Sequence, residues 1–157
     1  NISKPMSKKL EERIIPKENA AFRMDKNGNW HNQHEKFKHK KKINFFHESI
    51  QKDKNGYYIG QEIGNIREKV YFEYEDTALF VFDVKDDYTL ILNTKKEIKL
   101  KPKKLYVKDD NLYMKLKKED IKFVKRGLVN IFEHLIFEGK DVYIKFKGKE
   151  YKIKEKI

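Results

Sequence analysis

The chain has 157 residues, a formal net charge of +12 and no cysteine. This length suits one domain or two small lobes that share a core, and the lack of cysteine excludes disulfides and cysteine-ligated zinc sites. The longest apolar run, residues 78–82, is far shorter than the roughly 20 residues of a membrane-spanning helix. The first residues also lack the apolar stretch of a secretory signal, so we expect a cytoplasmic protein with no membrane partner.

The positive charge is almost entirely lysine. Of the 37 basic residues only four are arginine: Arg13, Arg23, Arg67 and Arg126. Nucleic-acid sites favour arginine, because its planar fork binds phosphates and base edges bidentately. A chain rich in Lys, Ile and Asn is also typical of AT-rich coding sequence, so we interpret many of the lysines as solubilising. One block remains a candidate nucleic-acid-binding surface: Lys36, Lys38, Lys40, Lys41 and Lys42.

The first third of the chain predicts a tail, a hairpin and a helix. Residues 1–20 are expected to be an N-terminal tail in which Ser7 caps a short helix that runs through Ile14. Residues 21–34 predict two strands joined by a turn at residues 25–28. Apolar residues at helical spacing then predict a helix over residues 42–51, and a strand begins at Tyr57.

The middle of the chain predicts β-structure. Apolar and polar residues alternate through residues 66–74, and turn residues predict hairpins over residues 79–93 and 105–116, followed by a short strand at residues 121–124. Lysines alternate with apolar residues over residues 95–104, 115–125 and 145–156. This alternation is typical of strands with one buried and one solvated face.

The C-terminal part predicts a helix over residues 127–138, stopped at Gly139, and a final hairpin over residues 142–153. Residues 43–50 align without gaps on residues 129–136, which indicates either two related lobes or the general likeness of amphipathic helices. We therefore predict an α+β fold of two small related lobes, each a helix packed on antiparallel strands, with a β-rich middle. The N-terminal lobe is expected at residues 21–75 and the C-terminal lobe at residues 76–157, together forming one compact unit.

Catalytic and metal-binding patterns find little support in the sequence. The histidines His31, His34, His39 and His47 match no metal motif, and nearby lysines would repel a cation, so we expect no metal and no cofactor. Glu73, Glu75 and Asp76 are close enough in sequence for acid–base work, but a turn and charge balance explain them more simply. No nucleophile elbow or phosphate-binding loop is present, so we expect a protein that is not an enzyme.

Several short motifs resemble a family of uncharacterised bacterial proteins, domain of unknown function 1285. Residues 22–30 resemble the family's opening Asp-x-x-Gly-x-Trp hairpin, residues 74–78 its Val-Glu-Asp-x-Pro element, and residues 123–128 its Val-Arg-x-Gly-Leu junction. The resemblance covers about residues 22–154 and identifies a divergent member. It implies an α+β fold with repeated helix-and-sheet lobes, no established reaction, and a binding or regulatory role such as signal transduction.

Three functional hypotheses follow. The leading one is a non-enzymatic module that binds a small molecule or a partner protein between its lobes, through Trp30, Glu75, Asp76 and Arg126. The second is nonspecific nucleic-acid binding through the lysine block. The third is an enzyme with an unrecognised site, which would require a deep pocket where His31, His34, Glu75 or Asp76 converge.

Overall fold

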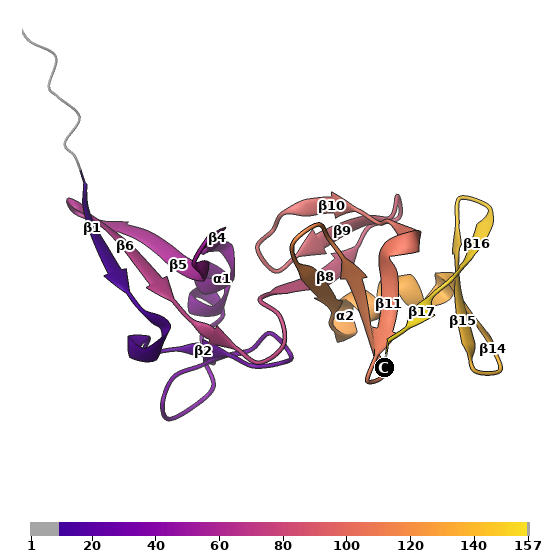
Figure 1. The fold of residues 1–157 in the computed structure, drawn as a ribbon, viewed down its shortest axis with the longest axis horizontal. Helices are drawn as coiled ribbons and strands as arrows, with labels where there is room; N and C mark the ends of the chain where they lie inside the picture. Colours follow the sequence, from indigo (N-terminus) through magenta and orange to yellow (C-terminus); the bar gives the residue numbers. More distant parts are fainter. Residues whose placement is uncertain (1–9, 157) are drawn as a thin grey trace, which may run out of the picture. The chain divides into compact units, whose positions relative to one another are not determined.

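The structure is a computed structural model that describes residues 10–156. This part of the chain is β-rich, with two short α-helices, and three of its four sheets mix parallel with antiparallel pairs, which agrees with the expected α+β class. No helix in it is long and apolar enough to cross a membrane. Contacts divide the chain into an N-terminal unit, Asn1–Met24 with Asn29–Tyr74, and a C-terminal unit, Asp25–Gly28 with Glu75–Ile157 (Figure 1).

The N-terminal unit contains two sheets and one α-helix. The four-stranded sheet has the order β1 (Glu11–Ile15), β6 (Ile66–Tyr71), β5 (Gly56–Ile63) and β4 (Ile50–Asp53). The three-stranded sheet has the order β3 (Trp30–His31), β2 (Arg23–Met24) and β7 (Glu73–Tyr74). A 3-10 turn, η1 (Lys17–Asn19), follows β1, and helix α1 (Lys40–Glu48) precedes β4.

Aromatic side chains form the core of the N-terminal unit around Trp30, which is 1% exposed. The rings of Phe22, Phe46 and Phe72 lie 5.7, 5.4 and 4.9 Å from the Trp30 ring, all edge to face, a favoured arrangement for aromatic pairs. The Trp30 indole donates a hydrogen bond of 3.3 Å to Nδ1 of the buried His47. Trp30 is therefore a core residue, and this position does not suit its predicted role as a surface for a ligand.

The N-terminal segment differs from the predicted helical tail. Ser7 lies outside the described residues, but Glu11–Ile15 form strand β1 and not a helix. The strand pairs in parallel with β6, from Glu11 beside Ile66 to Ile15 beside Val70. The extended form is favoured because β6 offers an open sheet edge and because ion pairs fix the strand there, with Arg13 3.3 Å from Glu68.

The C-terminal unit contains a large mixed sheet and a small antiparallel one. The large sheet has the order β10 (Glu97–Lys99), β9 (Thr89–Leu92), β8 (Leu79–Val84), β13 (Asp120–Phe123), β12 (Asn111–Lys115), β11 (Leu105–Lys108) and β17 (Lys154–Glu155). The small sheet has the order β14 (Leu135–Glu138), β15 (Asp141–Phe146) and β16 (Lys149–Lys152). Helix α2 (Lys125–Ile131) and the 3-10 turns η2 (Pro102–Lys104) and η3 (Phe132–His134) complete the unit.

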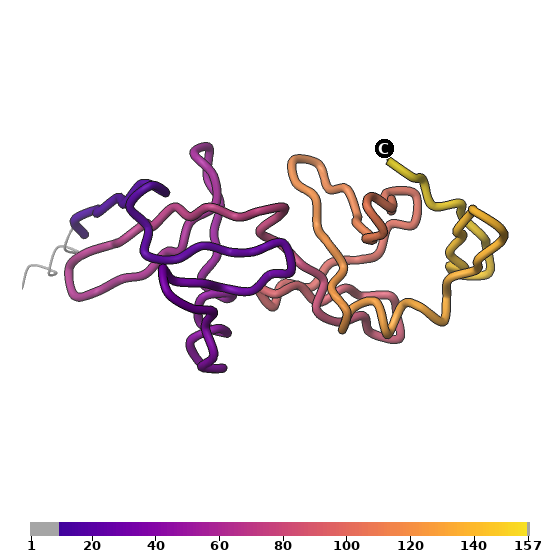
Figure 2. Tube along the Cα trace, turned by 90° about the horizontal axis from the view of Figure 1, so that it is seen from below, coloured from indigo at the N-terminus to yellow at the C-terminus, as the bar shows by residue number. Residues whose placement is uncertain are grey.

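The predicted hairpins of the C-terminal unit are confirmed. Strands β8 and β9, β11 and β12, and β15 and β16 all pair antiparallel. The centre of the large sheet is the parallel pair of β8 and β13, where Phe80, Val81, Ile121 and Phe123 are at most 1% exposed. In Figures 1 and 2 the small sheet, coloured towards yellow, lies beside the large sheet and not within it.

The predicted helix over residues 127–138 is only half helical. Helix α2 ends at Ile131, η3 follows, and Leu135–Glu138 form strand β14 paired with β15. The β-prone run Leu135–Phe137 gains ladder hydrogen bonds by pairing, which a helical continuation would forgo. Phe132, the first residue of η3, is 59% exposed.

Gly127 allows α2 to approach strand β8 closely. An added Cβ at this position would lie only 2.5 Å from the backbone oxygen of Val81. A side chain would therefore push the helix away from the strand. We predict that Gly127→Ala lowers the free energy of unfolding by about 1–3 kcal/mol, the typical cost of overpacking. Urea denaturation followed by circular dichroism measures the change.

The matched control for this prediction is Val129→Ala, on the same helix at a side chain that is 66% exposed. It should change the stability by less than about 0.5 kcal/mol, as surface substitutions usually do. Equal stability of the two variants would contradict the close approach of α2 to β8.

Candidate functional site

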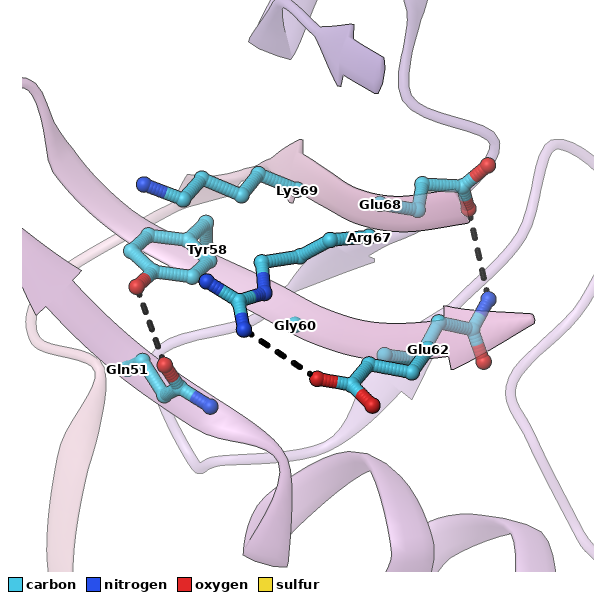
Figure 3. Close-up of a pocket in the computed structure, with 8 residues that line it drawn as sticks. Gln51, Tyr58, Gly60, Glu62, Arg67, Glu68 and Lys69 are labelled. Atoms are coloured by element: carbon cyan, nitrogen blue, oxygen red, sulfur yellow. Dashed lines mark hydrogen bonds and ion pairs between the residues drawn. The ribbon is translucent and has the colours of Figure 1, made fainter. Parts of the chain in front are cut away.

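A hollow in the N-terminal unit lies against the sheet formed by β4, β5 and β6, and six of its eight lining residues share one face (Figure 3). Its volume is about 390 Å³. The residues that line it are mostly polar: Gln51, Tyr58, Gly60, Gln61, Glu62, Arg67, Glu68 and Lys69. A hollow of this size falls in the range that binds small molecules in proteins.

Strand register explains why polar side chains gather on this face. Gln51 pairs with Tyr58, Gly60 with Lys69, and Glu62 with Arg67, and paired residues share a face. Gly60 has no side chain, so the sheet is left open in the middle of this row. A Cβ there would lie 3.0 Å from the Gln51 amide nitrogen and 3.2 Å from the Tyr58 ring, which shows how closely they border the space.

The polar groups around the hollow are held by mutual contacts. Tyr58 donates a hydrogen bond of 2.9 Å to Gln51, and Arg67 pairs with Glu62 at 3.3 Å (Figure 3). Both partners of the second pair are more than half exposed, so this pair contributes little to stability and is free to exchange partners. The arrangement offers a guanidinium, a carboxylate and an amide at one surface.

Three titratable groups beside the hollow have shifted pKa values. The Tyr71 hydroxyl donates to Asp53 at 2.6 Å and lowers the pKa of that carboxyl. A hydrogen bond to Glu12, 3.3 Å away, raises the pKa of the Lys69 ammonium. The contact with Asp53 raises the pKa of Tyr71 in turn. Each shift moves a pKa away from neutrality, so these groups keep their ordinary protonation states at neutral pH.

A second polar cluster lies in the C-terminal unit around Lys122. This side chain is only 5% exposed, and its ammonium lies 3.2 Å from Oδ2 of Asp76. It also donates a hydrogen bond of 2.8 Å to the backbone oxygen of Lys26, in the turn that belongs to this unit. Tyr113 donates to the same Asp76 oxygen at 2.6 Å. A buried ammonium requires such partners, because desolvation is costly.

Two stacked tyrosines border this cluster. The rings of Tyr106 and Tyr113, on neighbouring strands, are 5.0 Å apart and almost parallel. Burial raises the pKa of both phenols, and the carboxylates of Asp120 beside Tyr106 and Asp76 beside Tyr113 add to the effect. Both hydroxyls therefore remain protonated donors that hold the two carboxylates in place.

The predicted ligand-binding residues fall in different places. Trp30 belongs to the N-terminal unit, whereas Glu75, Asp76 and Arg126 belong to the C-terminal unit. Glu75 accepts a hydrogen bond of 3.1 Å from the backbone of Lys26, which places it next to the Lys122 cluster. Arg126 is exposed on the first turn of α2, with its guanidinium 5.9 Å from the Phe82 ring.

Sequence reasoning singled out Asp76 as a ligand-binding residue, not as the partner of Lys122, and it missed both Lys122 and the polar hollow. The pattern Ile121-Lys122-Phe123 indicated a lysine on a solvated face, but parallel pairing with β8 buries both faces of β13. The alternation of polar residues along β5 and β6 was visible. The signal that could have located the hollow is Gly60, a small residue in the middle of that polar row.

The histidines do not form a metal site in the part of the chain that the structure describes. Within residues 10–156 no three His, Asp or Glu side chains gather in a way that could hold an ion. His31 lines a separate hollow of about 280 Å³ in the N-terminal unit, together with Arg23 and Glu73. His31 and His34 belong to the N-terminal unit, whereas Glu75 and Asp76 belong to the C-terminal one.

The lysine block lies at and before the start of α1. All of its members are exposed: Lys36, Lys38, Lys40, Lys41 and Lys42. Lys38 pairs loosely with Glu35 at 3.6 Å, and Lys42 lies 4.3 Å above the Phe37 ring. The first turn of α1 has no acidic residue, so the positive end of the helix dipole adds to the lysine charge.

Comparison with solved structures tests the expected family likeness. A DUF1285 family protein from Silicibacter pomeroyi DSS-3 superimposes with a TM-score of 0.59 and 10% identity, over 92% of this chain and 84% of that one. The chain has the fold of a DUF1285 family protein. The predicted resemblance is thus confirmed at the level of the fold, which by itself assigns no activity.

Other comparisons add little. A DUF1285 family protein from Shewanella baltica OS155 matches 67% of this chain and 84% of its own length, with a TM-score of 0.45 and 15% identity. No family model and no curated protein matches the chain.

The Asp53–Tyr71 contact gives a pH-dependent prediction. Tyr71→Phe removes the hydrogen bond that lowers the pKa of Asp53, so this carboxyl should titrate nearer to its ordinary value of 3.8. A lowered pKa stabilises the folded protein above that value, and the contribution is lost as the pH falls through the lowered pKa. The variant should therefore be less stable than the wild type at neutral pH, and the difference should disappear in acid.

Carbon-detected NMR titration of Asp53 and urea denaturation at neutral and acid pH measure the two effects. Tyr58→Phe is the control, because its hydroxyl bonds to Gln51 and not to a carboxylate. The same Asp53 titration curve in wild type and Tyr71→Phe would show that Tyr71 does not set this pKa.

Proposed function

We propose that this protein is a non-enzymatic binding module, and that the hollow on the β4–β5–β6 face binds a small polar molecule. The observation that carries the proposal is the gap at Gly60, which is bordered by Gln51 and Tyr58 and flanked by the charged pair of Arg67 and Glu62. In small-molecule sites a few convergent polar groups fix the ligand in a concave space, and in this hollow such groups form most of the lining, which favours a polar ligand.

The charge states beside the hollow favour binding over proton transfer. A general acid or base works best with a pKa near the operating pH. The shifts at Asp53, Lys69 and Tyr71 are all in the opposite sense, away from neutrality. Of the three, Lys69 lines the hollow, where it is suited to hold a fixed charge against a ligand without exchanging a proton with it.

The lining also indicates the chemistry of the ligand. Arg67 supplies donors for an anionic or carbonyl group, and Glu62 supplies an acceptor for hydroxyl or amino groups. Because these two residues are paired and largely exposed, a ligand replaces an interaction worth at most about 1 kcal/mol. A compact molecule that carries both donors and acceptors fits this surface better than a large apolar one.

The test is a thermal-shift screen of polar metabolites and nucleotides, followed by titration of each hit into variants. A ligand at about 100 times its Kd should stabilise the wild type by about 2.7 kcal/mol. Gly60→Val, which fills the gap, should abolish the shift, and Arg67→Gln should reduce it. The backbone at Gly60 is not in the left-handed region, but a Cβ there meets Gln51 at 3.0 Å and Tyr58 at 3.2 Å, so circular dichroism must first show that Gly60→Val folds like the wild type.

Lys54→Gln is the matched control, because it removes the same charge from an exposed turn that does not line the hollow. It should leave the shift intact. A hit that stabilises Gly60→Val as well as the wild type would place the site elsewhere, and a screen without any hit would contradict the proposal.

A second candidate function is nonspecific nucleic-acid binding through the lysine block. The specific observation in its favour is that all five lysines are exposed and that the first turn of α1 adds no acidic residue to offset them. Phosphates bind such surfaces through charge neutralisation, without reading the base sequence.

Fluorescence anisotropy with labelled single-stranded RNA and duplex DNA tests this candidate. Binding should weaken by a factor of about 10 or more between about 50 and 200 mM salt if three or more phosphates are neutralised. The triple variant Lys38→Gln, Lys40→Gln, Lys41→Gln should lose most of the affinity. The control triple variant Lys103→Gln, Lys104→Gln, Lys149→Gln removes the same charge elsewhere; equal loss in both would show only a diffuse charge effect.

A further inference from the structure

Strand β14 is an edge strand without the usual protection. Edge strands present unpaired backbone groups, and soluble proteins guard them with lysine, proline or a bulge. In this lysine-rich chain the edge strands β4, β10, β16 and β17 each carry at least one lysine. The edge strands β1, β3 and β7 carry none, but β1 has three other charged residues, and β3 and β7 are only two residues long. Strand β14 has the sequence Leu135-Ile136-Phe137-Glu138, with no lysine and a single charge at its end.

Strand β14 is best compared with β4, because each of them is the edge strand that follows the α-helix of its unit. In each unit a helix is followed by an edge strand that pairs antiparallel with the next strand. At β4 the third residue is Lys52, whereas at β14 it is Phe137, which is 57% exposed. Where β4 has a lysine that hinders pairing with another strand, β14 thus has an exposed aromatic ring.

Further apolar side chains are exposed next to β14. The ring of Phe132 is 59% exposed and lies 5.5 Å from the ring of Phe137, and Val129 on α2 is 66% exposed. An apolar surface that continues onto an open sheet edge is suited to the addition of another strand, because backbone hydrogen bonds and apolar contacts form together.

We propose that β14 pairs antiparallel with β14 of a second copy of this chain, about a two-fold axis at Ile136. In a two-fold symmetric antiparallel pair one residue faces its own copy. With Ile136 at the centre, Leu135 faces Phe137 of the second copy, and every pair within the strands is apolar. With Phe137 at the centre, Ile136 would face the carboxylate of Glu138.

The charges around β14 are compatible with pairing to β14 of a second copy. Beyond the apolar pairs the same register brings Glu138 towards His134 of the second copy, at both ends of the strand pair. In the sequence directly around β14, acidic residues outnumber basic ones, since Glu133, Glu138 and Asp141 flank it together with Lys140. A strongly acidic partner therefore gains little here, whereas the strand is complementary to itself.

The expected dimer is weak, because four paired residues bury less than a standard interface. Its two copies each carry a charge of +12, so added salt should strengthen association by screening their repulsion. Sedimentation velocity over a concentration series, at low and high salt, measures the dimer association.

Phe137→Lys, which places a charged side chain on the exposed edge strand, should weaken dimerisation by at least about tenfold. Phe45→Lys, at an exposed phenylalanine on α1 (49% exposed), is the matched control and should not.

Disulfide trapping tests the register, and the absence of cysteine makes the result unambiguous. Ile136→Cys places two thiols opposite each other at the axis, within bridging range. In Glu138→Cys the two thiols lie about 14 Å apart along the strands, too far to bridge. Mild oxidation should therefore give covalent dimers of the first variant and not of the second.

Two results would overturn the proposal. One is a chain that stays monomeric at all concentrations and salts, with Ile136→Cys and Glu138→Cys oxidising equally slowly. The other is a dimer that Phe137→Lys leaves intact, which would place the interface elsewhere. Neither result bears on the polar hollow, because the hollow lies in the N-terminal unit and is tested by ligand binding.

Discussion

The buried ammonium of Lys122 is the constraint on which the C-terminal unit depends. It lies on β13, at the centre of the large sheet, and so cannot reach water. Its charge is balanced by Asp76, and it also donates a hydrogen bond to the backbone of Lys26. Desolvation makes an unpaired charge here costly, so the chain before β8 and the turn at residues 25–28 are both held against β13. Tyr113 extends the same arrangement to β12.

In the N-terminal unit the main feature is a polar hollow on its four-stranded sheet. One face of its four-stranded sheet carries the buried Ile59 and Val70, and the other carries a row of charged and amide side chains. Gly60 interrupts that row, and the hollow exists because no side chain fills the gap. The groups around it pair with one another, Tyr58 with Gln51 and Arg67 with Glu62, and present donors and acceptors to the space. This arrangement is the basis for our proposal that the hollow binds a small polar molecule.

Both units contain a helix followed by an antiparallel hairpin, in line with the internal similarity of the sequence. The difference between them lies at the edge strand. Strand β4 is guarded by Lys52, while β14 exposes Phe137 next to Phe132. Two elements with the same local topology are therefore suited to different surroundings, the first to solvent and the second to another strand.

The sequence by itself determined the elements that local chemistry specifies. Turn residues and two-residue alternation located the hairpins of β8 with β9 and β11 with β12, and the short motifs pointed to the fold that the solved structure shares. Only the tertiary structure decided what depends on partners distant in the chain. Residues 11–15 are extended because β6 offers an edge, residues 135–138 leave the helix because β15 pairs with them, and Trp30 is buried because three phenylalanines surround it. The polar hollow and the Lys122 cluster are of this second kind, since strand register and parallel pairing bring their residues together, and neither can be read from a single segment.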